Sequence, residues 1–188
     1  ALGAFSTGMG STDISFGMIT GGNWFKVPES IKVVFKGKPS QYVTGKDLIL
    51  EIIRILGVDG ALYKALEFTG DTIKYLSMDD RFSLCNMAIE AGAKNGIVAY
   101  DEITKEFLDT VAKNNNGLRA EPKIHYSDED ANYCQVIEID VEKLEPVIAY
   151  PFLPSNGHSV SQAVSDNIRV DQVFIGSCTN GRLSDFKV

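Results

Sequence analysis

The stretch VPESIKVVFKGKPSQYVTGKDLILEIIRILG, residues 27–57, predicts a β-strand that leads into an α-helix. The run from Ile31 to Phe35 is rich in β-branched residues, which is typical of a strand. Thr44 and Asp47 have the spacing of a capping box, in which two residues satisfy backbone N–H groups at a helix start. The apolar residues behind this box recur at helical spacing as far as the natural stop at Gly57: Leu48, Ile49, Ile52, Ile53 and Leu56.

The same alternation of strand and helix continues along the chain. A second capping box at Ser77 and Asp80 predicts a helix that ends at Gly92. Residues 102–113 predict an amphipathic helix, and the asparagine run at 114–117 predicts a turn. Further strands are expected over 61–68, 96–100, 133–141 and 172–175, and a glycine-loosened helix within 1–23.

This pattern predicts the α/β class, with alternating strands and helices in a three-layer domain flanked by partial domains. Residues 1–28 would be the tail of a preceding α/β domain, 29–148 the middle α/β domain, and 149–188 a linker with the start of a third domain. Three prolines punctuate the extended connector PVIAYPFLPSNGHS, the best candidate for a boundary. The chain begins without Met in a glycine-rich stretch and ends inside an expected helix, so we expect functional parts to lie outside it.

Composition argues against several kinds of partner. The chain has 188 residues, of which 44% are hydrophobic, and a net charge of −7. Nucleic acids and anionic membranes are bound through Lys and Arg, so an acidic chain without a basic patch predicts neither partner. Three widely spaced cysteines are no disulfide framework and indicate a reducing compartment, the cytoplasm. The two histidines, His125 and His158, lack ligand-like neighbours, which argues against a self-contained zinc site.

The segment VFIGSCTNGRLSDF, residues 173–186, is the strongest candidate for chemistry. A strand is expected to end in a tight turn at Gly176, with Cys178 just beyond it and Ser184 or Asp185 capping a helix. Open α/β sheets bind ligands at the carboxyl ends of strands, where loop amides and helix N-termini favour anions. A thiolate or an anionic iron–sulfur cluster would be stabilised there, although on composition alone a small buried cysteine is the commoner case.

The segment LCNMAIEAGA, residues 84–93, is the second candidate. On a helix Asn86 and Glu90 are one turn apart and share a face, beside an apolar stripe that includes Cys85. An amide and a carboxylate at the edge of a buried stripe can point into a cleft. A random pair of this kind is more often an ordinary solvated helix edge.

The opening stretch ALGAFSTGMGSTD has the glycine spacing of a phosphate loop between Gly3 and Gly8. Met9 and Gly10 occupy the positions of the Lys and the Ser or Thr that such a loop needs, so a phosphate loop is rejected. Asp13 is expected to cap a helix or a turn.

Taken together, these strings resemble the aconitase family. GSCTN, followed by a small residue and an acidic residue near the next helix start, resembles the family's first cluster-ligand motif. The LCNM string resembles a helix that places an Asn and a Glu near the cluster and the substrate. The opening stretch and WFKVPESIKV resemble the segment after the family's Asp-Ser-His-Thr motif, which is itself absent. VPESIKVVFKG and YKALEFTGD point to the branch of the 3-isopropylmalate dehydratases and homoaconitases.

The resemblance implies an iron–sulfur hydro-lyase. In this family three cysteines hold a [4Fe-4S] cluster whose open iron acts as a Lewis acid in the reversible dehydration of a small hydroxy-diacid. It implies Cys178 as a cluster ligand with Asn180 beside it, Asn86 near the cluster, Glu90 as a polar contact to the substrate, and Cys85 as a packing residue. A separate small subunit would complete the site, and in the isopropylmalate branch the reaction belongs to leucine biosynthesis. Since the other ligands are expected beyond the chain, we expect this chain alone to hold no cluster and to be inactive.

Three other functions stay open. A homoaconitase or another substituted-malate dehydratase would run the same chemistry on a different side chain. A non-catalytic binding module could use the same scaffold. A thiol enzyme could use Cys178 as nucleophile, with His125 or His158 as its base.

Overall fold

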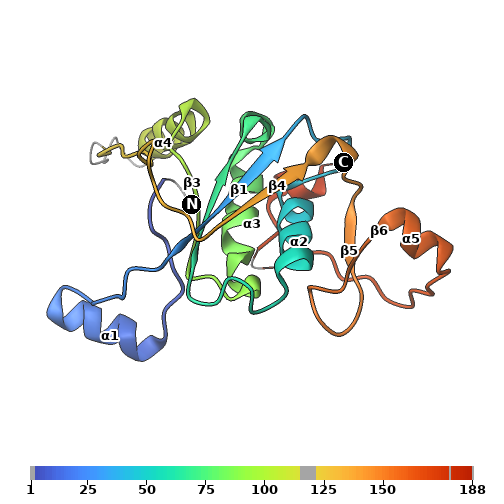
Figure 1. Ribbon diagram of the computed structural model, residues 1–188, viewed down its shortest axis with the longest axis horizontal. Coiled ribbons are helices and arrows are strands. Elements are labelled where there is room, and N and C mark those ends of the chain that lie inside the picture. The colour runs from blue at the N-terminus through green and yellow to red at the C-terminus, as the bar shows by residue number, and fades with distance from the viewer. Residues whose placement is uncertain (1–2, 115–121, 178, 188) are drawn as a thin grey trace.

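The computed structural model of the chain describes residues 3–114, 122–177 and 179–187. Its centre is a parallel sheet of four strands in the order β3-β2-β1-β4 (Figure 1). The strands are β1 (Ser30–Lys36), β2 (Ala65–Thr69), β3 (Asn95–Val98) and β4 (Gln135–Asp140). Parallel neighbours need crossover connections, and the expected alternation with helices supplies them. The α/β class is therefore confirmed.

One face of the sheet is buried under helices. Alternate β1 residues Ile31, Val33 and Phe35 have no exposed surface and join a single hydrophobic cluster with the helices. These helices are α2 (Gly45–Leu56), α3 (Met78–Asn86) and the 3-10 helix η2 (Met87–Ala91), and α2 and α3 lie side by side (Figure 1). Fully burying one large aliphatic or aromatic side chain stabilises a fold by about 1.5–3 kcal/mol, so this interface dominates the energetics of the domain.

The opposite face of the sheet is polar and partly open. Glu138 of β4 is exposed and pairs with Lys36 of β1 at 2.6 Å, and Val136 beside it is 56% exposed. Helix α4 (Glu102–Asn114) packs against α3 through Phe107 and Phe82. The exposed ion pair and the exposed Val136 leave this face open to solvent over β1 and β4.

Both predicted capping boxes are present. The backbone N and Oγ1 of Thr44 donate to Asp47 Oδ2 at 2.7 and 2.8 Å. The other oxygen of Asp47 accepts from the N of Val147 at 2.8 Å, which ties the hairpin of β5 (Val147–Ala149) and β6 (Gly157–Ser159) to the start of α2. The expected extended connector thus contains a short hairpin. The division at 28 and 148 stays a prediction.

Two expected strands differ from the structure. Residues 61–64 form a turn, with Tyr63 at φ 57°, so the strand predicted over 61–68 begins only at Ala65. Residues 172–175 are not a strand: Val173, Phe174 and Ile175 are 72%, 86% and 71% exposed. An apolar run forms a strand only where a sheet edge pairs with it, and no described strand does so here.

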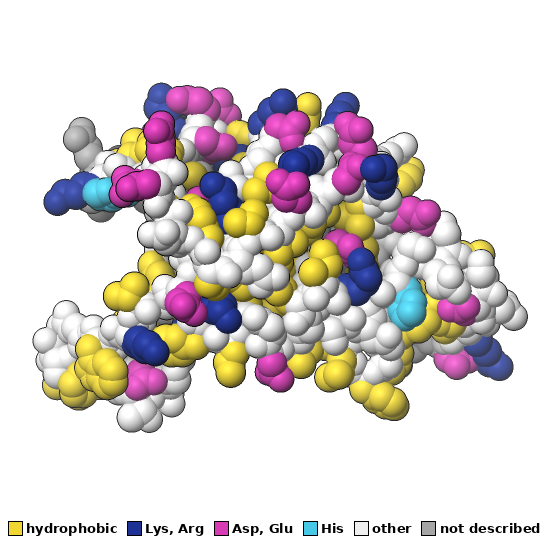
Figure 2. All heavy atoms as spheres, in the orientation of Figure 1, with side chains coloured by type: hydrophobic (Ala, Val, Ile, Leu, Met, Phe, Trp, Pro, Cys, Tyr) yellow, Lys and Arg dark blue, Asp and Glu magenta, His cyan; other side chains and the backbone are white. Residues whose placement is uncertain are grey.

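The remaining elements lie at the periphery. Helix α1 (Ser11–Thr20), expected within the glycine-rich opening, projects away from the sheet without a buried residue, and its hydrophobic side chains lie exposed (Figures 1 and 2). On the face that Figure 2 shows, basic side chains lie interspersed with acidic ones. The short elements are η1 (Asp71–Tyr75), η3 (Val141–Lys143), α5 (Val160–Ser165) and η4 (Leu183–Phe186). Across the described parts of the chain, no helix combines the length and apolarity needed to cross a membrane.

Candidate active site

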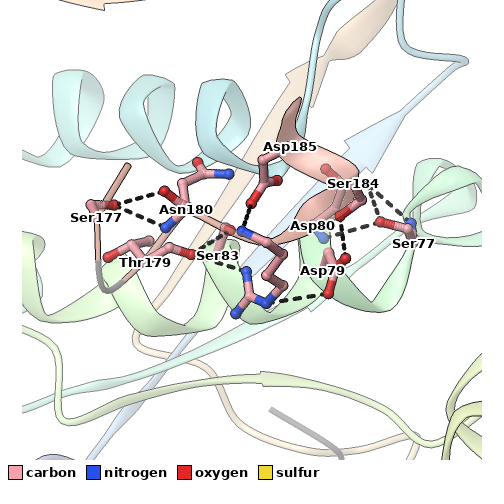
Figure 3. A network of polar contacts seen from close by, with 10 residues as sticks. Ser77, Asp79, Asp80, Ser83, Ser177, Thr179, Asn180, Ser184 and Asp185 are labelled. Carbon is pink, nitrogen blue, oxygen red and sulfur yellow. Dashed lines mark hydrogen bonds and ion pairs between the residues drawn. The ribbon is translucent and has the colours of Figure 1, made fainter. Parts of the chain in front are cut away.

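The two strings singled out in the sequence meet in the structure. Ser83 Oγ donates to the backbone oxygen of Thr179 at 3.1 Å (Figure 3). Asn86 Nδ2 donates to Thr179 Oγ1 at 2.8 Å. Ser83 and Asn86 are three positions apart on α3 and therefore face the same side of the helix. The GSCTN turn is thus docked on the LCNM helix, although Asn86 and Thr179 are 93 positions apart.

The GSCTN turn is closed by its own hydrogen bonds. Ser177 N donates to Asn180 O at 2.8 Å, and Asn180 N donates to Ser177 Oγ at 2.9 Å (Figure 3). Gly176, just before the turn, has φ 125°, a conformation that favours glycine, as its predicted role in a tight turn requires. Cys178, the predicted cluster ligand, lies outside the described residues.

The second half of the segment docks at the start of α3. Arg182 Nε lies 3.2 Å from Asp79 Oδ1, and Ser184 Oγ donates to Asp79 Oδ2 (Figure 3). Asp185 accepts from the backbone N of Arg182 at 2.7 Å, so it caps η4 as predicted, while Ser184 binds α3 instead. Since Thr179 lies beside Asn86 and Ser184 beside Asp79, the segment runs antiparallel to the helix.

A polar pocket of about 420 Å³ opens beside this contact. Asn86 and Arg182 line it from the docked side, and Asn95 and Gly96 line it at the amino end of β3. Asn95 is only 3% exposed, and neither polar atom of its side-chain amide has a hydrogen-bond partner. A buried amide without a partner costs free energy, which a polar ligand in the pocket would recover.

Glu90 is the second predicted catalytic residue. It lies on η2, one position after the pocket-lining Ile89, and its Oε2 is buried without a hydrogen-bond partner. A carboxylate oxygen in this state is free to accept a hydrogen bond from a ligand. Asn86 lines the pocket and contacts the GSCTN turn, whereas Glu90 is not among the residues that line the pocket. That the two side chains serve one catalytic site stays a prediction.

The thiols of the described residues do not form a cluster site. Burial raises the pKa of the Cys85 thiol to about 11, so this side chain is neutral and packs in the core, as expected from the resemblance. Cys134 is exposed before β4, where its Sγ donates to Ser30 O at 3.3 Å. Iron–sulfur clusters are held by several thiolates, and the described residues contain no group of three or more metal-binding side chains. This donor set therefore does not fit a [4Fe-4S] cluster by itself.

Several residues of the contact were not predicted. The sequence patterns assign no role to Asp79 or Ser83, and they include Thr179 and Arg182 only as members of the motif string. Asp79, Ser83 and Asn86 are spaced at intervals of four and three residues, and this spacing alone predicts that all three lie on one helix face. The partner of that face could not be deduced from spacing.

The chain is an α/β protein with a parallel sheet, and the polar pocket beside the docked turn is its candidate ligand site. The model of the aconitase family (aconitate hydratase) matches residues 1–169, which include Asn86 and Glu90 but not the GSCTN turn. The chain belongs to the aconitase family.

Similar proteins cover the whole chain, including the turn. The chain is 93% identical to the 3-isopropylmalate dehydratase large subunit of Aliarcobacter butzleri over 188 residues. It is 75% identical to the large subunit of the same name from Nautilia profundicola and 73% identical to that from a Sulfurovum species. In each case all of this chain is aligned, and it spans 44% of the relative's length.

Proposed function

We propose that this chain is part of the large subunit of an iron–sulfur hydro-lyase that isomerises 2-isopropylmalate to 3-isopropylmalate by dehydration and rehydration, a step of leucine biosynthesis. One structural observation carries the proposal: the GSCTN turn is docked on the LCNM helix through Asn86 and Thr179. A site shared by the two strings requires them to lie together, and this contact meets that requirement. The names of the similar large subunits support the reaction.

The complete protein would hold a [4Fe-4S] cluster, with Cys178 as one ligand, Asn180 beside it and the remaining ligands outside this chain. In this proposal Asn86 orients the turn that carries Cys178, because its amide holds Thr179, the next residue. Glu90 contacts the substrate through its unpartnered carboxylate oxygen. The partners are a small subunit and a small hydroxy-diacid, and the compartment is the cytoplasm.

Turnover by the complete large subunit that carries this sequence, purified anaerobically with a small subunit, tests the proposal. 2-Isopropylmalate and homocitrate are compared, and the unsaturated intermediate is followed by its absorbance. We expect turnover of 2-isopropylmalate and little of homocitrate. A preference for homocitrate would make the protein a homoaconitase, and binding of a diacid without turnover of either compound would make it a binding module.

A further inference from the structure

Helix α3 begins with two adjacent carboxylates, Asp79 and Asp80, which bind different partners. Asp80 is used entirely in capping: it accepts from Ser77 N at 3.1 Å, from Ser77 Oγ at 2.6 Å and from Gly45 N at 2.9 Å. Asp79 makes none of these bonds. Its two oxygens face segment 179–186, where they meet Arg182 and Ser184 (Figure 3).

The negative charge of Asp79 stabilises the Arg182 guanidinium at the start of α3. The first turn of a helix carries a partial positive charge, which disfavours a cation such as the Arg182 guanidinium. A carboxylate at position 79 offsets that charge and gives Arg182 an ionic partner. The side chains are only 31% and 34% exposed, so solvent screens this pair less than a fully exposed one.

Arg182 transmits this contact to the GSCTN turn. Its NH1 donates to the backbone oxygen of Thr179 at 3.0 Å, and its guanidinium lies 5.4 Å from the centre of the Phe82 ring. The same Thr179 oxygen accepts from Ser83. A guanidinium fixed by Asp79 at one end therefore restrains Thr179 at the other, next to the position where Asn86 binds the hydroxyl.

We infer that Asp79 is a positioning residue that holds segment 179–186 along α3 through Arg182 and Ser184 and so sets Thr179 against Asn86. The docking stands on the contacts alone, whereas its consequence for catalysis rests on the proposed function. Asp79 itself does not line the pocket.

Amide hydrogen exchange of this chain, followed residue by residue by NMR, tests the docking. In Asp79→Ala the amides of Asn180, Arg182 and Asp185 should exchange about 5- to 30-fold faster, the factor that corresponds to one or two kcal/mol of lost docking energy. The amides of β1 should keep their wild-type rates. Glu106→Ala, which removes an exposed carboxylate from α4, is the matched control and should change neither group.

Three further variants make the test specific. Arg182→Ala should speed the same amides. The double variant Asp79→Ala/Arg182→Ala should change the docking free energy by less than the sum of the two single changes, because both remove the same ion pair. Asp79→Asn keeps an acceptor for Ser184 without the charge and should fall between wild type and Asp79→Ala. Additive effects, or a segment that exchanges in Asp79→Ala as it does in Glu106→Ala, would overturn the inference. Faster exchange throughout α3 would also overturn it, because Asp79 would then stabilise only the helix start.

The outcome is separable from that of the proposed function. Exchange in this chain reports on docking without any cluster or substrate. A complete enzyme that turns over 2-isopropylmalate while Asp79→Ala leaves exchange unchanged would remove the positioning role and keep the function. Loss of docking in Asp79→Ala with no turnover by the complete protein would keep the positioning role and remove the proposed function.

Discussion

The side-chain amide of Asn86 donates a 2.8 Å hydrogen bond to the hydroxyl oxygen of Thr179. Ser83, one turn earlier on α3, binds the backbone oxygen of the same residue. Thr179 is therefore held through both its side chain and its main chain. In the proposed function this contact adjoins the proposed cluster ligand, because Thr179 is the residue after Cys178 in the sequence.

Substitution of Thr179 should change the NMR signals of the Asn86 side-chain amide. Thr179→Val keeps the shape of the side chain but removes the acceptor, at a cost of about 0.5–1.5 kcal/mol. The Asn86 side-chain NH2 signals in a ¹⁵N–¹H spectrum should then shift, whereas Thr179→Ser should leave them near their wild-type positions. Signals that move equally in both variants would show that Asn86 does not bind this hydroxyl.

The pair of Arg81 and Asp101 should be the most sensitive polar contact for stability. Arg81 is fully buried, and two of its nitrogens lie 2.7 Å from the two oxygens of Asp101. Asp101→Ala leaves a buried guanidinium without its counter-ion, which should cost about 2–4 kcal/mol in urea unfolding, less than a fully buried pair because the Asp101 side chain is 35% exposed. Glu102→Ala removes the neighbouring exposed pair with Lys105 and should cost no more than about 0.5 kcal/mol. Equal losses would mean that the Asp101 contact is not a buried ion pair in solution.

The same pair predicts a dependence of stability on acid. Burial acts to raise the pKa of Asp101, but the hydrogen bonds from Arg81 and Thr104 outweigh it, so the pKa lies below its usual value. Asp101 thus contributes stability above its unfolded pKa of about 3.9 and loses that contribution as the pH falls through the lower folded pKa. Between about pH 4 and pH 2 the free energy of unfolding should fall more steeply in wild type than in Asp101→Asn. Parallel curves would contradict the assigned shift.

The two described cysteines should differ in reactivity. Burial raises the pKa of Cys85 to about 11, so about 0.1% of this thiol is ionised at pH 8, and the side chain is also shielded. In a Cys178→Ser background, iodoacetamide should modify exposed Cys134 at least about tenfold faster than Cys85. The difference should vanish in urea, and its persistence there would show that burial is not the cause.

Gly45 should be intolerant of a side chain. A Cβ at this position would overlap the backbone carbonyl of Asp80, where the starts of α2 and α3 meet. Gly45→Ala should therefore force the helices apart and cost about 1–3 kcal/mol. Gly22 is exposed with no atom near its Cβ position, and Gly22→Ala should change stability by no more than about 0.5 kcal/mol. Thermal unfolding of both variants decides the point.

Local signals in the sequence were enough to predict much of the fold. The boxes at Thr44 and Ser77 fix helix starts through contacts within four residues, and β1 carries its own pattern of burial. The strand predictions for residues 61–64 and 172–175 were wrong, because an apolar run does not reveal whether a partner strand is available. The docking of Thr179 on Asn86 depends on a contact between distant segments, which neither segment encodes alone.

Turnover by the Glu90→Gln variant of the complete two-subunit enzyme is the most direct test of a shared reaction site on α3, η2 and the GSCTN turn. Glu90→Gln keeps the size of the side chain and removes the charge of the unpartnered carboxylate, so kcat for 2-isopropylmalate should fall by about 10²- to 10⁴-fold. The iron and sulfide content should remain that of wild type. A Glu90→Gln enzyme that keeps its cluster and turns over 2-isopropylmalate within a few-fold of the wild-type rate would show that the Glu90 carboxylate does not take part in the reaction.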